Sequence, residues 1–338
     1  MADQPPRSNA PRILILRRDN IGDLVCTTPL IAALRGQLPG AWIGALVNTY
    51  NAEVLARNSL LDQVLVYEKM KHRSKGALAL FKDRLKLLSS IRGRRLDAVL
   101  VPAPSAQSLK LANSLGARKV VLARSDLPAQ MHEVERSFET GRELGITGSP
   151  GKVRVFPDLA ALERVRDLAG TGPFVAIHIS ARRPKQRWPL QRYAALAREL
   201  ARGSRVMLLW APGPGDDPRH PGDDVAAAKV LELAGGGGHI IPVPTPDLAR
   251  LIAALSLARL VICPDSGAMH LAAALGKPVV ALFGDSPVAR WRPWGVAHRI
   301  VRPESGDLAD LQLEPVLAAV REMVSDVEQD QAPATRSA

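Results

Sequence analysis

The chain has 338 residues, 46% of them hydrophobic, and a mean hydropathy near zero, which is typical of a globular protein with substantial cores. Its 45 Lys and Arg against 33 Asp and Glu give a net charge of +12, which favours an anionic partner: nucleic acid, an anionic membrane or a phosphorylated substrate. Nucleic acid is the least favoured of these, because the arginines are scattered and only three Tyr and five Phe could stack on bases.

The cysteines and the N-terminus predict a location in the cytoplasm. Cys26 and Cys263 are isolated thiols, as expected in a reducing compartment, and neither they nor the seven His show metal-ligand spacing. Residues 1–10 form a polar leader without the apolar core of a signal peptide. No run of about 18 apolar residues predicts a membrane span, so any membrane contact is expected to be peripheral.

In the first half of the chain, apolar runs typical of buried strands alternate with helical patterns. Strands are predicted at 12–17, 41–47, 63–68, 96–104 and 117–123. Helices are predicted from residue 24, near 77–91 and near 131–144. In the first of these helices, Thr27, Thr28 and Pro29 predict an irregular first turn.

The second half repeats this alternation. Strands are predicted at 172–180, 204–213 and 238–243, and helices at 189–201, 225–234, 246–258 and 308–327. Strands and helices that alternate at this spacing form βαβ units around a mostly parallel sheet. The fold class expected is therefore α/β, with two Rossmann-like domains, at 11–150 and 172–310, and a cleft between them. Residues 145–171 are expected to connect the domains, 311–327 to form a C-terminal helix, and 1–10 and 328–338 to be tails.

A βαβ unit at residues 261–284 contains an acidic turn that could bind phosphate. Asp265 or Ser266 is expected to cap the helix that follows, and Gly276 and Pro278 to end it. A helix start beyond the carboxyl end of a strand presents free N–H groups and a partial positive charge, where phosphates bind in open α/β sheets. His270 would add a donor. The alternative is a well-capped connector between two core strands.

Two further segments could carry chemistry. Asp23 follows the first strand in the run Asn20-Ile21-Gly22-Asp23, either as a helix N-cap or as a general base. Four cations lie between the strand ending at residue 180 and the helix from residue 189, either on a solvated loop or as a phosphate clamp. These cations are Arg182, Arg183, Lys185 and Arg187.

Four segments in order resemble glycosyltransferase family 9, the ADP-heptose:lipopolysaccharide heptosyltransferase group. They are ILILRRDNIGDLVCTTPLIAALR, HIS…KQRWPLQRYAALARELA, the PGPGDD loop and CPDSGAMHLAAALGKPVVALFG…ARWRPWG. The resemblance covers roughly residues 12–295. It implies the GT-B architecture, inverting transfer without metal or other cofactor, a donor bound mainly by the C-terminal domain and an acceptor bound by the N-terminal domain.

By motif position, the resemblance implies that Asp23 is the catalytic base, with Gly22 and Arg18 on the acceptor side. The implied donor residues are Ser180, Lys185, Arg187, Asp265, Ser266, Gly267, Ala268 and His270. The family has a phosphate-contacting lysine two residues before the tryptophan, where this chain has Gln186. Either Lys185 or Arg187 supplies that charge instead, or the donor preference differs from that of the heptosyltransferases proper.

The function expected is cytoplasmic, inverting transfer of heptose from the nucleotide sugar ADP-heptose to a lipopolysaccharide-core glycolipid, with possible peripheral contact with the anionic inner membrane. One alternative keeps the fold and changes donor or acceptor, as in an N-acetylglucosaminyltransferase or a protein O-heptosyltransferase. Another is a non-catalytic nucleotide-sugar binding protein or a nucleic-acid-binding protein.

Overall fold

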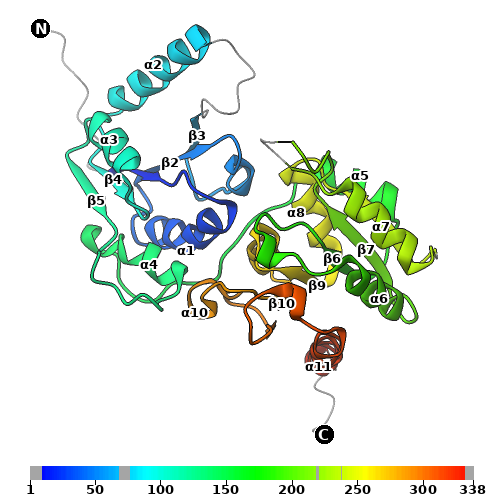
Figure 1. Cartoon of the computed structure of the whole chain (residues 1–338). Coiled ribbons are helices and arrows are strands. Elements are labelled where there is room, and N and C mark those ends of the chain that lie inside the picture. The colour runs from blue at the N-terminus through cyan, green and yellow to red at the C-terminus, as the bar shows by residue number, and fades with distance from the viewer. Residues whose placement is uncertain (1–9, 68–76, 218–220, 237, 332–338) are drawn as a thin grey trace, which may run out of the picture. The chain divides into compact units, whose positions relative to one another are not determined.

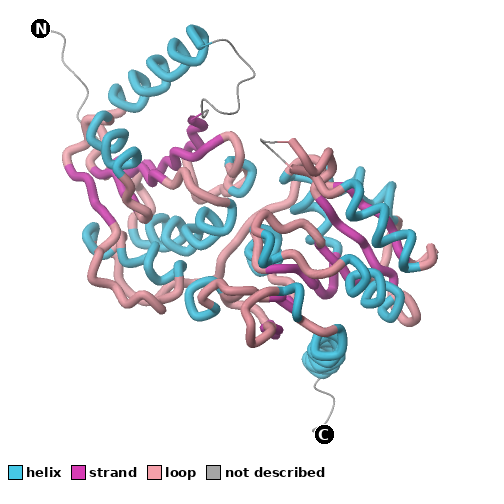
Figure 2. The backbone as a smooth tube through the Cα atoms, in the orientation of Figure 1, coloured by secondary structure: helices cyan, strands magenta, loops and turns pink. Residues whose placement is uncertain are grey.

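A computed structural model describes residues 10–67, 77–217, 221–236 and 238–331 (Figure 1). The chain divides into two compact units, Met1–Gly151 and Lys152–Ala338. Each unit is built around one parallel sheet whose strands alternate with helices along the chain. Figure 2 distinguishes the strands, in magenta, from the helices that flank them in each unit.

Unit 1 has a five-stranded sheet in the order β3-β2-β1-β4-β5. Its strands are β1 (Arg12–Leu16), β2 (Trp42–Asn48), β3 (Gln63–Tyr67), β4 (Ala98–Val101) and β5 (Lys119–Leu122). Its helices are α1 (Ile21–Gln37), α2 (Ala77–Gly93), α3 (Ala106–Ser114) and α4 (Glu133–Glu139), with 3-10 turns at Ala52–Val54 and Arg142–Leu144. The order reverses between β1 and β4, which makes their carboxyl ends the topological switch point of this sheet.

The expectation of an irregular first turn in α1 is wrong. The helix runs without interruption from Ile21 to Gln37 although it contains Pro29. Proline has no N–H for the carbonyl four residues earlier, which here belongs to Val25. The hydroxyl of Thr28 donates to that carbonyl at 2.7 Å and so replaces the missing bond.

Unit 2 has a six-stranded sheet in the order β11-β10-β9-β6-β7-β8. Its strands are β6 (Phe174–His178), β7 (Arg205–Trp210), β8 (Ile240–Pro244), β9 (Ala258–Pro264), β10 (Val279–Leu282) and β11 (His298–Val301). Its helices are α5 (Leu159–Ala169), α6 (Leu190–Leu200), α7 (Asp224–Ala234), α8 (Leu248–Leu257), α9 (Gly267–Ala274), α10 (Val288–Trp291) and α11 (Leu313–Gln331), with 3-10 turns at Pro184–Gln186 and Leu308–Asp310. This is the Rossmann strand order, with the switch point between β6 and β9.

Helices cover both faces of the second sheet. Alternate residues of β6, β7, β9 and β10 form a core with α6, α7 and α11, and the other face packs against α8 and α9. Unit 2 begins at Lys152 and α5 packs on α8, so residues 152–171 of the segment expected to connect the domains belong to this unit. Within the described residues, no helix is both long enough and apolar enough to cross a bilayer.

Candidate functional site

The candidate residues form two groups, one in each unit, at the carboxyl ends of central strands. In unit 1 they follow β1, and in unit 2 they follow β6 and β9. Both groups therefore lie at the switch point of their own sheet, where helices diverge to opposite faces and leave room for a ligand.

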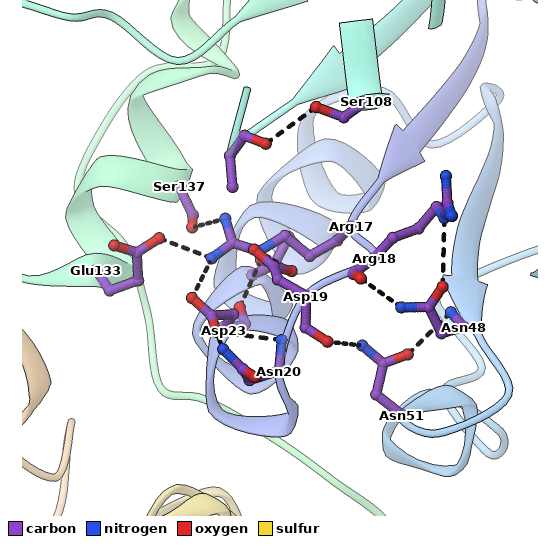
Figure 3. Close-up of polar contacts among 12 residues, drawn as sticks. Arg17, Arg18, Asp19, Asn20, Asp23, Asn48, Asn51, Ser108, Glu133 and Ser137 are labelled. Carbon is purple, nitrogen blue, oxygen red and sulfur yellow. Dashed lines mark hydrogen bonds and ion pairs between the residues drawn. The ribbon is translucent and has the colours of Figure 1, made fainter. Parts of the chain in front are cut away.

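In unit 1 the group is centred on Arg17, the first residue after β1 (Figure 3). The Arg17 side chain is fully buried, and its Nη2 donates both to Asp23 Oδ1 at 2.9 Å and to Glu133 Oε1 at 2.7 Å. Its Nε lies 3.0 Å from Asp19 Oδ1, and its Nη1 donates to Ser137 Oγ at 3.4 Å. One buried cation thus holds three carboxylates, two from the β1–α1 segment and one from α4.

Asp23 lies in the first turn of α1, where it also stabilises the helix start. Its Oδ2 accepts from the backbone N–H of Asn20 at 3.3 Å and from the Asn20 side-chain amide at 2.9 Å. The residue is 9% exposed. The N-cap of α1 is Asn20, and Asp23 lies three residues later, where its side chain completes a capping box. The alternative prediction that Asp23 is the N-cap is therefore wrong. A structural role in the helix start and a chemical role are compatible here, since each carboxylate oxygen can accept more than one hydrogen bond.

Burial and the neighbouring charges shift the pKa values of Arg17 and Asp19. Burial disfavours the charged form of Arg17, but Asp19, Asp23 and Glu133 outweigh burial and raise the pKa of Arg17. Burial also raises the pKa of Asp19 to about 6, with the charge of Arg17 opposing the rise and that of Asp23 adding to it. Asp19 therefore titrates close to physiological pH, which is unusual for an aspartate.

The two predicted acceptor-side residues adjoin this group. Gly22 is buried in the first turn of α1. The Arg18 guanidinium lies 4.1 Å from the centre of the Tyr67 ring and donates to Asn48 Oδ1 at 3.3 Å. Burial lowers the pKa of Arg18.

Arg17, Asp19 and Glu133 were missed by the sequence reasoning. A signal for Arg17 was present, because a charged residue directly follows the buried apolar strand 12–16. Glu133 had no comparable signal, since an acidic residue at a helix start is usually explained by the helix dipole. Only the packing of α4 on α1 brings it to Arg17.

In unit 2, three segments meet around Asp265, at the carboxyl end of β9. Asp265 Oδ2 accepts from Gln186 Nε2 at 3.0 Å and lies 3.8 Å from Arg183 Nη2. Gln186 and Arg183 both donate to the hydroxyl of Ser286, which follows β10. The Gln186 side chain is buried, whereas the Arg183 side chain is 56% exposed. Gln186 therefore organises the turn, and Arg183 carries the charge beside it.

The backbone of this region approaches closely at Gly284, just after β10. A Cβ on Gly284 would lie 2.7 Å from the carbonyl oxygen of Lys185, so only glycine fits without displacing the loop. The loop that carries Arg183 and Gln186 is therefore held against the end of β10.

The start of α9 has no side-chain cap. The expectation that Ser266 caps this helix is wrong: Ser266 occupies the N-cap position, but its side chain makes no capping hydrogen bond. Its hydroxyl is buried without a hydrogen-bond partner, and the Asp265 carboxylate is engaged by Gln186. Gly267 and Ala268 are the first two helical residues, and Gly276, with φ of +72°, follows the helix end as expected. A helix start without a side-chain cap, beside an unpartnered hydroxyl, fits an anion.

The other predicted donor residues have protein partners. Lys185 Nζ lies 3.8 Å from Asp285, and Arg187 lies 3.8 Å from Asp223 and donates to the Ala181 carbonyl. The Ser180 hydroxyl accepts from the backbone N–H of Ala211 at 2.9 Å, which joins the ends of β6 and β7.

Two histidines of unit 2, His178 at the end of β6 and His270 in α9, are buried. His270 lies in the first half of α9 and packs edge-on against Trp291, with ring centres 6.1 Å apart. The tryptophan-containing segment after β10 is thereby anchored to α9. Burial lowers the pKa of His178 to about 4, so this imidazole is neutral at physiological pH.

Comparisons with known proteins show the family of this chain. Residues 113–318 match the model of glycosyltransferase family 9 (heptosyltransferase). The chain is 26% identical to lipopolysaccharide heptosyltransferase 3 of Escherichia coli, over 86% of this chain and 88% of the relative. It is 25% identical to lipopolysaccharide heptosyltransferase 2 of E. coli strain K12, over 87% of this chain and 89% of that protein.

Solved structures show the same fold. A family 9 glycosyltransferase from Veillonella parvula superposes with a TM-score of 0.80 at 20% identity, covering 94% of this chain and 97% of the other. The E. coli ADP-heptose heptosyltransferase II superposes with a TM-score of 0.75 at 21% identity, covering 95% of this chain and 100% of the other. The predicted fold class, α/β of the GT-B type with two Rossmann-like units, is confirmed. The chain belongs to glycosyltransferase family 9, the heptosyltransferase family, and is a glycosyltransferase.

Proposed function

We propose that this enzyme transfers heptose from ADP-heptose to a lipopolysaccharide-core acceptor with inversion at the anomeric carbon. The observation that carries the proposal is the uncapped turn at Asp265–Ala268, where a buried, unpartnered hydroxyl and a helix start adjoin Arg183. Such a turn suits the diphosphate of a nucleotide sugar. The donor and acceptor are taken from the relatives, which are lipopolysaccharide heptosyltransferases.

In the proposed reaction, Asp23 accepts the proton of the acceptor hydroxyl as its oxygen attacks the anomeric carbon. The bond from that carbon to the diphosphate oxygen breaks on the opposite face, and ADP leaves with the bonding electron pair. Positive charge at the start of α9 and on Arg183 stabilises the leaving diphosphate, so we propose a reaction without metal or other cofactor. Base and leaving-group stabilisation thus come from different units.

We propose that Arg183 takes the role of the phosphate-contacting lysine that the family resemblance places at position 186. Gln186 is buried and bonded to Asp265, and Arg187 lies near Asp223. Lys185 lies 3.8 Å from Asp285, and Arg183 Nη1 lies at the same distance from that carboxylate. The half-exposed Arg183 is the cation of this loop that lies within 4 Å of Asp265 in the described residues.

The Arg183→Gln variant is expected to bind ADP about 5- to 30-fold more weakly, since a charge-assisted hydrogen bond to phosphate contributes about 1–2 kcal/mol. Isothermal titration calorimetry with ADP measures this. Arg182→Gln removes the same charge from the neighbouring exposed residue and is expected to bind ADP like the wild type. Equal weakening in both variants would mean that only the net charge of the loop matters.

A thermal-shift panel of ADP-, UDP-, GDP- and CMP-sugars tests the donor. A ligand that binds the folded state at 100 times its Kd stabilises it by about 2.7 kcal/mol, which raises Tm by several degrees. ADP-heptose is expected to give the largest shift, followed by ADP. A larger shift with UDP-N-acetylglucosamine would replace the proposed donor and favour an N-acetylglucosaminyltransferase.

We further propose that transfer occurs at the cytoplasmic face of the inner membrane, with the protein bound peripherally. The net charge of +12 supports this, because both the anionic membrane and a phosphorylated glycolipid attract a basic protein. Sedimentation with vesicles containing anionic phospholipid is expected to show binding that weakens as salt rises.

A further inference from the structure

Glu133 is a buried carboxylate that shares its cation with the proposed base. It is the first residue of α4, it is 2% exposed, and it lies 110 positions after Asp23 in the chain. A single nitrogen, Arg17 Nη2, donates to Glu133 at 2.7 Å and to Asp23 at 2.9 Å (Figure 3). Glu133 is thus linked to Asp23 through one guanidinium group.

The number of charges in this group matters for the base. One arginine faces three carboxylates, so its positive charge is divided among them instead of neutralising Asp23 alone. A carboxylate paired with an undivided, buried arginine holds its proton more weakly and is a poorer base. Charged and titratable groups near Asp23 come from three segments: Arg17 and Asp19 precede α1, Cys26 lies on α1, and Glu133 and Arg136 lie on α4. Burial raises the pKa of the Cys26 thiol. Arg136 Nε lies 4.0 Å from Glu133 Oε2.

We propose that Glu133 is a positioning residue for the transfer reaction: acting through Arg17, it orients the Asp23 carboxylate and preserves its basicity. This inference rests on the proposed role of Asp23 as the base. Glu133 itself touches neither substrate nor the reacting atoms. Glu133 contributes by binding the Arg17 guanidinium from α4 and by partly neutralising the positive charge of that guanidinium.

The Glu133→Gln variant separates charge from packing. Glutamine has nearly the same shape, and its amide oxygen can still accept from Arg17, but the negative charge is removed. The positive charge of Arg17 is then shared by two carboxylates instead of three. We therefore expect kcat to fall roughly tenfold, which is less than the loss expected when the general base itself is removed. The pH dependence of kcat is expected to change, because a negative charge beside the shared guanidinium is removed. KM for the donor is expected to stay unchanged, since the proposed donor residues lie in unit 2.

A second measurement does not depend on activity. The charge of Glu133 contributes to the raised pKa of Asp19, so Glu133→Gln is expected to lower the pKa of Asp19 below about 6. Carbon-detected NMR of the Asp19 carboxyl, in the full chain labelled at aspartate, follows this titration.

Two matched controls lie on the same helix. Glu139→Gln makes the same substitution at a residue paired with Arg142, and Ser137→Ala removes a neutral contact with Arg17. Both are expected to keep the wild-type pH profile. The inference is overturned if Glu133→Gln also keeps the wild-type profile, or if Ser137→Ala shifts it equally.

The controls also separate this inference from the proposed function. An inactive wild type, or an Asp23→Asn variant with full activity, would remove the proposed base and with it the positioning role, whatever the NMR titration shows. An active wild type, an inactive Asp23→Asn variant and an unaltered Glu133→Gln variant would remove the positioning role alone.

Discussion

Replacement of Asp23 by asparagine is expected to lower the rate of sugar transfer by about 10²- to 10⁴-fold, the usual contribution of a general base. Asparagine keeps the size of the side chain and an oxygen that can accept from Arg17, but it cannot take the proton of the acceptor hydroxyl. ADP affinity is expected to be unchanged, because the proposed diphosphate turn belongs to unit 2. Single-turnover transfer with ADP-heptose, together with calorimetry with ADP, measures both quantities.

A control must separate lost chemistry from lost structure, since Asp23 also bonds to Asn20 at the start of α1. Asp126→Asn makes the same substitution at an exposed residue, which pairs with Arg124 in the segment after β5. Transfer by Asp23→Asn at a rate close to that of the wild type would disprove the base role. Equal loss of transfer and of ADP binding would indicate misfolding of the variant instead.

Replacement of Arg17 by methionine is expected to have the largest effect on stability. It leaves the buried carboxylates of Asp23 and Glu133, and the partly exposed carboxylate of Asp19, without their cation. Removal of one partner from a buried ion pair lowers the free energy of unfolding by about 3–5 kcal/mol. Urea unfolding followed by hydrogen exchange of the β1 and α1 amides measures the loss within unit 1.

The same variant makes a prediction about pH. Buried carboxylates without a cation bind protons more tightly in the folded than in the unfolded state, so stability falls as pH rises above about 4. The deficit of Arg17→Met relative to the wild type is therefore expected to be smaller at pH 5 than at pH 7. Arg124→Met, which breaks the exposed pair with Asp126, is expected to change stability little at either pH. A pH-independent deficit would mean that lost packing, not unpaired charge, destabilises the variant.

Some elements were not foreseen in the sequence. Helix α3 was not predicted, because its apolar pattern is weak and it follows a proline-rich turn. Strand β11 was also missed. It has four residues at the edge of the sheet, beside β10, and is only partly buried, so it lacks the apolar run of a central strand. The predicted helix at 131–144 divides into α4 and a 3-10 turn at Arg142–Leu144, and a Cβ on Gly141 between them would lie 2.7 Å from the Leu30 side chain on α1.

Sequence alone determined the alternation of strands and helices, the parallel α/β class and the turns that follow β1, β6 and β9. These features depend on hydrophobic period and on glycine and proline at element ends, which are local properties of the chain. It also indicated Asp23 and the Asp265 turn as the positions where chemistry is expected.

The tertiary structure alone decided which charges meet. Arg17 and Glu133 are 116 residues apart, and only the packing of α4 on α1 joins them into one buried group with Asp23. In the same way, the meeting of the β6, β9 and β10 loops selects Arg183, rather than Lys185 or Arg187, as the cation beside Asp265. Residue types show that charges are available, but partners distant in sequence are set by packing, which no local pattern records.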